Sequence, residues 1–223
     1  MTLKNPGWPA VLTRRDITLR PYRRSDAARW SRLRRSNEAW LAPWEPSPGQ
    51  NWYKGHSTAA YKNMLRVFKK SAKAGTTWPF AICVNDEIVG GITVGNIVRR
   101  AFCNAYVGYW IDQGHAGRGI TTTALALVID HALTTGRLHR LEVNIRPENE
   151  PSNRVAEKLG LRKEGFHSKY LYIDGAWRDH FGYAVTVEDL NGERMVDRME
   201  RRLNSFSFDP AESADPQAHP IGE

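Results

Sequence analysis

The stretch VGYWIDQGHAGRGITTTALALVID, residues 107–130, decides the fold class of this chain. An aromatic and β-branched run is followed by Gly117-Arg118-Gly119 and then by apolar residues at helical spacing, which predicts a strand, a glycine-rich turn and a helix. Glycines let backbone N–H groups turn toward a ligand, and a helix N-terminus adds partial positive charge. The turn therefore favours an anion site suited to a pyrophosphate, with Arg118 as a charged contact. A tight strand-to-helix connection without a ligand is the structural alternative.

Two other phosphate-binding motifs are absent from the sequence. The P-loop pattern GxxxxGK[ST] does not occur, and the glycine pair is followed by Ile, Thr and Thr, so GxGxxG is not completed. Gly108 lies inside the strand, beside Tyr109 and Trp110. A glycine there indicates a bulge or the close approach of a ligand. A pantetheine arm with a pyrophosphate fits this layout, because its amides can pair with the strand edge while its phosphates reach the turn.

Outward from this stretch, strands and helices alternate along the chain. Strands are predicted at residues 16–20, 79–84, 87–94, 102–111, 138–145, 166–173 and 177–187, and helices at 26–35, 57–74, 120–135, 150–159 and 192–203. The order predicts a mixed α/β (α+β) sheet with helices on its faces. We expect a loose arm over residues 1–13, one domain over 14–190, and a charged helix with a disordered acidic tail over 191–223. The Pro-rich stretch 41–52 is predicted to be a loop whose tryptophans pack as a lid.

The composition is that of a globular protein with a sizeable core. The 223 residues are 41% hydrophobic and 25% charged, with eight Trp, eight Tyr and seven Phe, which excludes global disorder. Cys83 and Cys103 are the only cysteines, and without a CxxC or Cys/His cluster no zinc module or other metal site is predicted. Both cysteines lie in apolar runs and are expected to be reduced core thiols, with a disulfide or a reactive thiol as alternatives.

The terminal sequence and the charge distribution indicate the cellular location and the class of partner. No apolar stretch approaches the ~20 residues of a membrane span, and the first residues lack a secretory apolar region, so a cytoplasmic protein is expected. The net charge is +8, while the tail from Asn204 to Glu223 holds four acids and no Lys or Arg, so the rest of the chain carries +12. A basic body favours phosphate-bearing partners, whether nucleotides, nucleic acid or a ribonucleoprotein surface.

Three segments together resemble the GNAT superfamily of acetyl-CoA-dependent N-acetyltransferases. GYWI followed by AGRGIT (residues 108–121) is similar to the family's pyrophosphate loop, and NEPSNRVAEKLGLRKEG (149–165) is similar to its asparagine-to-EKLGF helix. YLYIDGAWRDHFGYAV (170–185) resembles the ribosomal-protein-alanine N-acetyltransferase branch, the RimJ/RimL type, as does LRPYRRSDA (19–27). The resemblance covers about residues 14–190. It implies the GNAT fold, with a mixed, mostly antiparallel sheet of about seven strands, and acetyl-CoA as co-substrate.

The sequence departs from the family pattern at three positions. Ala116 stands where the loop motif has Gln or Arg, and Thr121 occupies its last small position. Because backbone amides do the binding in such a loop, neither change removes the site. Ala156 stands where some relatives place a tyrosine acid, so a tyrosine-acid mechanism lacks its residue at that position.

The resemblance also implies site residues. The implied coenzyme contacts are Tyr109, Trp110, Ile111, Gly117, Arg118, Gly119, Ile120, Thr121, Thr122, Asn149 and Asn153, with N–H groups near residues 109–111 as oxyanion donors. Glu142, in the strand LEVNI, is the candidate general base, because some relatives have a glutamate there; an exposed strand carboxylate is the alternative. Asn149 and Ser152 are further catalytic candidates that would bond the pantetheine or the leaving sulfur, or else form the N-cap and turn that open the next helix.

Other polar residues carry weaker signals. His115 is either a base beside the loop or an ordinary surface histidine, and WRDH (177–180) is interpreted as part of a substrate groove or a sheet edge. Asp179 and His180 do not indicate a hydrolase, because GxSxG is missing. The helix near residues 26–35 and the turn before it can face ribosomal RNA or an acidic acceptor, or form a solvated face; their arginines are Arg23, Arg24, Arg29, Arg32, Arg34 and Arg35.

Three functions follow, in order of preference. The first is transfer of an acetyl group from acetyl-CoA by direct attack of a protein α-amine, on a ribosomal protein that begins with Ala or Ser. An α-amine has a pKa of ~7.7–8.0 against ~10.4 for Lys, so it needs only a weak base. The second is the same chemistry on a small amine such as an aminoglycoside, polyamine or amino acid. The third is a non-catalytic module on RNA or the ribosome. Monomer and homodimer both stay open.

Overall fold

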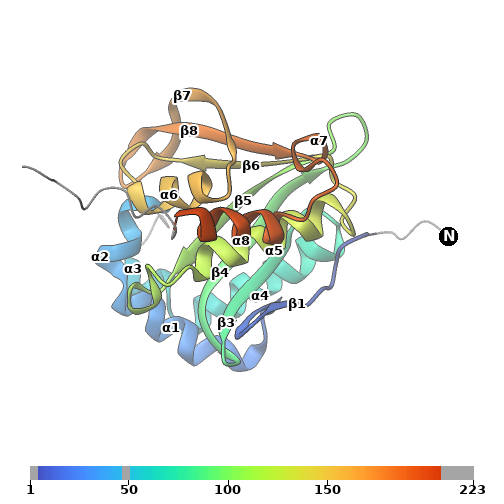
Figure 1. Ribbon diagram of the computed structural model, residues 1–223. Coiled ribbons are helices and arrows are strands. Elements are labelled where there is room, and N and C mark those ends of the chain that lie inside the picture. Colours follow the sequence, from blue (N-terminus) through green and yellow to red (C-terminus); the bar gives the residue numbers. More distant parts are fainter. Residues whose placement is uncertain (1–4, 47–50, 207–223) are drawn as a thin grey trace, which may run out of the picture.

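The computed structural model describes residues 5–46 and 51–206, which form one eight-stranded sheet with helices on both faces (Figure 1). The strand order is β1-β2-β3-β4-β5-β6-β8-β7. The strands are β1 Leu12–Arg14, β2 Ile17–Pro21, β3 Trp78–Val84, β4 Glu87–Val98, β5 Asn104–Ile111, β6 Arg140–Ile145, β7 Arg162–Ile173 and β8 Ala176–Thr186. The helices are α1 Ala27–Ser36, α2 Glu38–Leu41, α3 Trp52–Gly55, α4 Thr58–Lys73, α5 Ile120–Leu133, α6 Glu150–Lys158, α7 Val187–Leu190 and α8 Met195–Phe206, with short 3₁₀ turns η1 Arg24–Asp26, η2 Ala42–Trp44 and η3 Gln113–His115.

The sheet is antiparallel except where β5 meets β6. These two strands run parallel and pair only at Asn104↔Arg140, Ala105↔Leu141 and Tyr106↔Glu142. Beyond Tyr106, β5 keeps its partner β4 on one side and has no strand on the other. The sheet therefore splits into two wings at this point, and the split leaves two facing strand edges whose backbone groups are free for a ligand.

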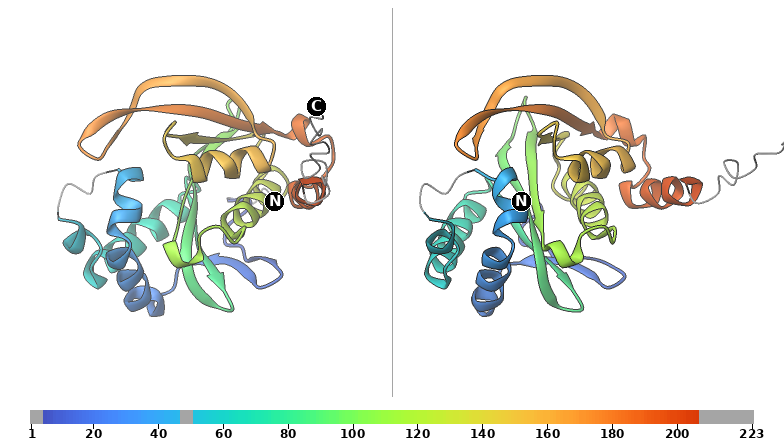
Figure 2. Two further views of the ribbon diagram at one scale, coloured as in Figure 1. Left: turned by 60° about the vertical axis from the view of Figure 1, so that its left-hand side comes forward. Right: turned by 90° about the vertical axis from the view of Figure 1, so that its left-hand side faces the viewer.

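Helices from different parts of the chain cover the two faces of the sheet. Helices α1 to α4 lie on one face, and α5, α6 and α8 lie on the other (Figure 2). The α5 face holds the larger core, which includes Phe80, Leu125 and Leu141. The α1/α4 face holds a smaller aromatic core around Trp30 and Tyr61. Each face of the sheet thus has its own core, and the core on the α5 face includes residues from both wings, such as Phe80 of β3 and Leu141 of β6.

Helix α5 is apolar around most of its circumference, and both of its sides are covered by other elements. It packs on the sheet with one side, and α8 lies against its other side (Figure 1). Asp130, near the end of α5, accepts hydrogen bonds from the backbone N–H groups of Met195 (2.6 Å) and Val196 (3.2 Å) at the start of α8. The predicted helix after residue 191 is therefore present and belongs to the folded unit, which extends past residue 190.

The N-terminal segment differs from the prediction of a loose arm. From residue 5 on it is packed: the Trp8 ring lies edge-on to Phe80 at 5.0 Å, and Asn5 donates to the carbonyl of Ala72 at 2.6 Å. Residues 12–14 then form β1, which raises the strand number from about seven to eight. The short polar β1 strand has no hydrophobic alternation of its own, so only its pairing with β2 reveals it.

The other expectations on the fold are met with small shifts of boundary. The mixed, mostly antiparallel sheet is confirmed. In the stretch 41–52 the short elements η2 and α3 interrupt the predicted loop, and Trp52 is buried as expected; residues 47–50 lie outside the described part. Cys83 and Cys103 are both free, Cys83 buried and Cys103 half-buried. The predicted acidic tail after residue 206 lies outside the described residues. No helix of the described chain could cross a membrane.

Candidate functional site

A cavity of about 570 Å³ occupies the split between β5 and β6. Its walls come from both wings of the sheet, from the turn before α5 and the first turn of that helix, from α6, and from α2 with η2. One part of its wall, the amide end, is formed by Gly117 and residues 119–122. The other, the tryptophan end, is formed by Trp40, Trp44, Glu45, Asn144, Arg146 and His180.

The amide end is a set of backbone donors without acceptors. Gly117 and Gly119 have φ of 77° and 75°, and a Cβ at either position would meet no atom within 4 Å. Within the described chain, the N–H groups of residues 117–122 make no hydrogen bond, since the first such bond of α5 runs from Thr123 to the Gly119 carbonyl at 2.9 Å. Unpaired amides at the N-terminus of a 14-residue helix bind an anion such as a pyrophosphate.

The middle of the cavity follows the open edge of β5. Gly108 lies there with no atom within 4 Å of an added Cβ. The hydroxyl of Tyr109 reaches across to the backbone carbonyl of Ser152 at 3.5 Å, and burial raises the pKa of Tyr109 to about 12, so its phenol stays protonated at neutral pH. Trp40 Nε1 donates to the carbonyl of Ile111 at 3.1 Å, which fixes α2 at the end of this strand.

The tryptophan end is held by two arginines. Arg34, whose side chain is 6% exposed, binds both carboxylate oxygens of Glu45 and lies over the Trp110 ring at 4.9 Å. Arg146 donates to the carbonyl of Pro43 at 2.6 Å and lies over the Trp44 ring at 5.1 Å. These contacts fix the Glu45 carboxylate and the indole rings of Trp44 and Trp110, all of which line the cavity.

A family model described as an acetyltransferase (GNAT) domain matches residues 16–162. The chain belongs to the GNAT acetyltransferase family. Among curated relatives, the [ribosomal protein uS5]-alanine N-acetyltransferase of Escherichia coli K12 is 33% identical over 180 residues, which cover 80% of this chain and 91% of the relative. The resemblance seen in the sequence is confirmed.

Solved structures agree with the assignment to the GNAT family. RimJ of Mycobacterium smegmatis, in complex with CoA-disulfide, is 39% identical, with a TM-score of 0.86 over 88% of this chain and 96% of that one. The ribosomal-protein-S5-alanine acetyltransferase of Vibrio fischeri is 30% identical, with a TM-score of 0.74 over 81% of this chain and 98% of that one.

In this GNAT protein the predicted coenzyme residues gather around the cavity, with two exceptions. Those that line it are Tyr109, Trp110, Ile111, Gly117, Gly119, Ile120, Thr121, Thr122 and Asn149. Arg118 is exposed beside the loop and does not line the cavity. Asn153 is 8% exposed and turned inward: its Nδ2 donates to the carbonyls of Arg146, Pro147 and Asn149 at 3.0–3.2 Å. The side chain of Asn153 thus closes the loop before α6.

Asn149 and Ser152 form the N-cap and the first turn of α6, which is one of the two roles that the sequence left open. Asn149 Oδ1 accepts the N–H of Ser152 at 3.2 Å, so it caps α6. Both residues also line the cavity, and the Ser152 hydroxyl has no hydrogen-bond partner among the described residues. The cap positions this hydroxyl at the split, and its contact with a ligand stays a prediction. His115 also lines the cavity but is bonded to Asp112 at 2.7 Å.

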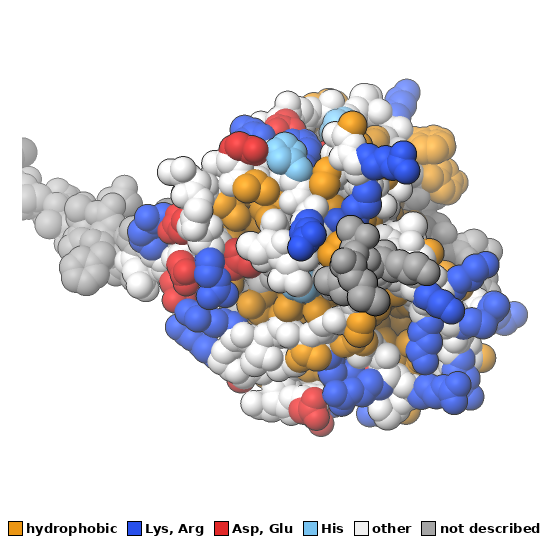
Figure 3. All heavy atoms as spheres, turned by 90° about the vertical axis from the view of Figure 1, so that its right-hand side faces the viewer, with side chains coloured by type: hydrophobic (Ala, Val, Ile, Leu, Met, Phe, Trp, Pro, Cys, Tyr) orange, Lys and Arg blue, Asp and Glu red, His pale blue; other side chains and the backbone are white. Residues whose placement is uncertain are grey.

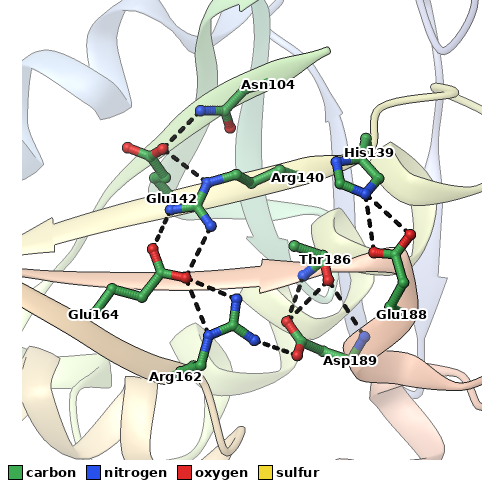
Figure 4. Close-up of polar contacts among 9 residues, drawn as sticks. All are labelled: Asn104, His139, Arg140, Glu142, Arg162, Glu164, Thr186, Glu188 and Asp189. Carbon is green, nitrogen blue, oxygen red and sulfur yellow. Dashed lines mark hydrogen bonds and ion pairs between the residues drawn. The ribbon is translucent and has the colours of Figure 1, made fainter. Parts of the chain in front are cut away.

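Glu142 lies in the closed part of the sheet, outside the cavity lining. Its Oε1 accepts hydrogen bonds from Asn104 Nδ2 at 2.7 Å and Arg140 Nε at 3.0 Å. Arg140 continues to Glu164 and from there the ion pairs reach Arg162, so Glu142 ends a network that spans three strands (Figure 4). The general-base role of Glu142 stays a prediction, and the geometry favours the alternative, a strand carboxylate, here held in ion pairs.

The sequence does not identify the tryptophan end as a site. Asn144 and Arg146 are distinguished there only as alternates of Glu142 on one strand face, and His180 only as part of WRDH. The sequence does not mark Glu45 as a site residue, because its partner Arg34 is one of several arginines in a helix whose pattern predicts an exposed face. In the structure Arg34 is buried, and the aromatic rings over which it lies include Trp52 and Trp110 from other segments.

Proposed function

We propose that the protein transfers the acetyl group of acetyl-CoA to the N-terminal α-amine of a protein that begins with Ala or Ser. The observation that carries the proposal is the cavity at the β5–β6 split, whose wall includes both the free amides before α5 and the tryptophans of α2 and η2. Relatives with 30–39% identity are named as ribosomal-protein-alanine acetyltransferases or as RimJ bound to a coenzyme A species.

The chain's own groups fit the coenzyme along this path. The N–H groups of residues 117–122 hold the pyrophosphate, and the free edge of β5 pairs with the amides of the pantetheine arm. Gly108 leaves the space that the arm needs on this edge. The coenzyme supplies an acetyl thioester, and the N–H groups near residues 109–111 stabilise charge on its carbonyl oxygen. Ser152 offers its free hydroxyl to the sulfur.

The tryptophan end receives the acceptor. Trp40 and Trp44 form its walls, and the Glu45 carboxylate, held in place by Arg34, offers a hydrogen-bond acceptor to an entering amine. An α-amine has a pKa of ~7.7–8.0, so a fraction is neutral and nucleophilic at pH 7 without a strong base, whereas a lysine amine at ~10.4 is not. The site therefore suits an N-terminal amine better than a lysine side chain.

The surface charge supports a partner rich in phosphate. Between Glu45 and Asp86 the sequence has no acidic residue. In this segment α4 exposes Lys62, Arg66, Lys69, Lys70 and Lys73, and none of these forms an ion pair within the described residues. Figure 3 shows Lys and Arg side chains gathered along the edge opposite the C-terminal end. We include the ribosome in the proposal as the setting in which the acceptor is met.

Thiol release from acetyl-CoA against a peptide panel tests the proposal. The panel holds peptides that begin with Ala, Ser or Met, one peptide with a blocked N-terminus and an internal Lys, and a set of small amines. We expect release with free Ala or Ser termini and none with the blocked peptide. Release with small amines alone would replace the protein acceptor by a small-molecule one, and silence with every acceptor would refute the proposed transfer.

A further inference from the structure

We propose that His180 of β8 is the catalytic base of this site, the group that takes the proton from the acceptor amine. The proposal rests on the proposed amine acetylation and assigns a proton acceptor to it. His180 lines the cavity at the tryptophan end and is 2% exposed, so the cavity is the space that remains open to its ring. It comes from the same face as Asn144, because Asn144 pairs with Gly182 and alternate residues of a strand share a face.

The hydrogen bonds of His180 fix which ring nitrogen is basic. Nδ1 lies 3.0 Å from the backbone carbonyl of Arg178. A carbonyl only accepts, so Nδ1 carries the hydrogen and the neutral ring has its lone pair on Nε2. No described residue forms a hydrogen bond with Nε2. The ring is thus oriented by the backbone of its own strand, with an acceptor nitrogen left for a ligand.

An irregular stretch of β7 holds the ring in place. His167 pairs with His180 and Leu171 with Arg178, so three residues of β7 stand opposite Asp179 alone. Lys169, at the centre of this bulge, has φ of 48° and donates its N–H to Asp179 Oδ1 at 2.7 Å. Bulges of this kind re-aim side chains next to active sites.

The bulge covers His180 with an aromatic ring. Tyr170 lies edge-on to His180 at 5.7 Å and stacks on His167 at 4.9 Å. Gly182 makes room for His167, because a Cβ there would meet its Nε2 at 2.5 Å. The base is therefore supported from β7, and the side of the ring toward the cavity is kept clear.

The surrounding groups favour a neutral imidazole. Burial lowers the pKa of His180 below its ordinary value of 6.5 despite its bond to the Arg178 carbonyl. The charged and titratable groups that act on it across the strands are Arg146 and His167, which favour the neutral form, and Glu148, which opposes them. Asp179 on the same strand is engaged by Lys169, and Glu45 across the cavity by Arg34. At pH 7 the lone pair on Nε2 is free to accept a proton.

The proton balance needs no further reagent. The amine nitrogen forms a bond to the acetyl carbon, and the C–S bond breaks with its electron pair on sulfur. The proton that the nitrogen loses moves to Nε2 of His180, and the thiolate takes a proton from water. The imidazolium then neutralises the hydroxide that this leaves, so the products are an amide and a thiol.

The variant His180→Asn separates this role from a structural one. The Asn amide can still donate to the Arg178 carbonyl, but nothing replaces Nε2. We expect kcat/KM to fall about 10²- to 10³-fold, which is the usual effect of removing a general base, with the Kd for coenzyme A unchanged. The matched control is His139→Gln, at an exposed histidine that is bonded to Glu188 and does not line the cavity; we expect less than about a threefold change.

The pH profile gives a readout that a packing role would not move. Below the pKa of His180, both the acceptor amine and the imidazole are protonated, so log kcat/KM for the wild type rises with a slope near two. In His180→Asn only the amine titrates, and the slope falls to one. A variant with wild-type rates, or with a slope that is still two, would overturn the assignment.

The experiments distinguish a wrong base from a wrong acceptor. The acceptor used in the pH series is whichever amine the wild type acetylates, so a small-molecule acceptor changes the substrate and still tests His180. Side-chain ¹⁵N NMR adds a measurement without turnover: we expect the tautomer with hydrogen on Nδ1 at pH 7. Hydrogen on Nε2 would overturn the base, whereas a wild type that is inactive on every amine refutes the proposed function and the base with it.

Discussion

The two ends of the cavity differ in the chemical groups that form them, which are backbone amides at one end and side chains at the other. The amide end consists of backbone N–H groups from one continuous segment, residues 117–122. The tryptophan end consists of side chains from segments far apart: Arg146 reaches a carbonyl of η2 that lies 103 positions earlier in the chain. Backbone donors are the same for any residue type, so Ala116 and Thr121 cost the amide end little. The tryptophan end depends on side-chain identity, and we expect acceptor specificity to reside there.

The largest effect is expected from a β-branched residue in the amide end. Gly119→Val forces valine into a left-handed conformation and turns the N–H groups of α5 away from the ligand. Loss of about two charge-assisted hydrogen bonds, at ~1.5 kcal/mol each, raises the Kd for coenzyme A about 100-fold. Titration calorimetry measures this directly.

Gly175→Val is the matched control for that variant. Gly175 lies in the β7–β8 turn with φ of 72°, against 75° for Gly119, and a Cβ would meet no atom within 4 Å at either site. The backbone strain is therefore similar, but only Gly119 lines the cavity. Equal affinities of both variants and the wild type would mean that the pyrophosphate does not bind at the amide end.

A smaller effect is expected in the middle of the cavity. Gly108→Val adds a branched side chain beside the open edge of β5, at a position where a Cβ would meet no protein atom within 4 Å. The added volume clashes with the pantetheine arm, and about 1–2 kcal/mol of overpacking raises the KM for acetyl-CoA about tenfold while leaving the melting temperature unchanged. Gly165→Val, also on a strand and without neighbours of an added Cβ, is the control. A loss of stability without a change in KM would contradict the path along β5.

The same contrast explains how much the sequence could predict. Gly117, Gly119 and the helix after them are local signals, so the amide end and the fold class can be predicted from the sequence. His180 and Glu45 become site residues only through contacts between distant strands and helices, which no spacing in the sequence encodes. Glu142 is a candidate in the sequence that the structure places elsewhere. The alternation of polar and apolar residues shows which face of the strand it lies on, but not that its carboxylate is bonded to Asn104 and Arg140.

Glu142→Gln decides between the two candidate bases. The variant loses the ion pair with Arg140 but stays the same size, and half-exposed pairs of this kind contribute about 1 kcal/mol to the free energy of unfolding. We expect urea unfolding to show a loss of that order, while the turnover rate changes less than about threefold. If the turnover rate instead fell by about 100-fold or more with unchanged stability, the base role would return to Glu142, and His180 would be contradicted.

The smallest effect concerns the far end of the same network. Hydrogen bonds from Arg140 lower the pKa of Glu164 to about 2, from an ordinary value of 4.5. A carboxylate with a lowered pKa contributes stability above its unfolded pKa and loses it as the pH falls toward the folded one. Because the Glu164 side chain is 33% exposed, we expect Glu164→Gln to cost only about 0.5 kcal/mol at pH 7. Urea unfolding at pH 7, 5 and 3 should show this difference intact at pH 5 and reduced at pH 3. A difference that grows on acidification would mean that Glu164 is protonated more easily in the folded state, and that the network does not hold it as a carboxylate.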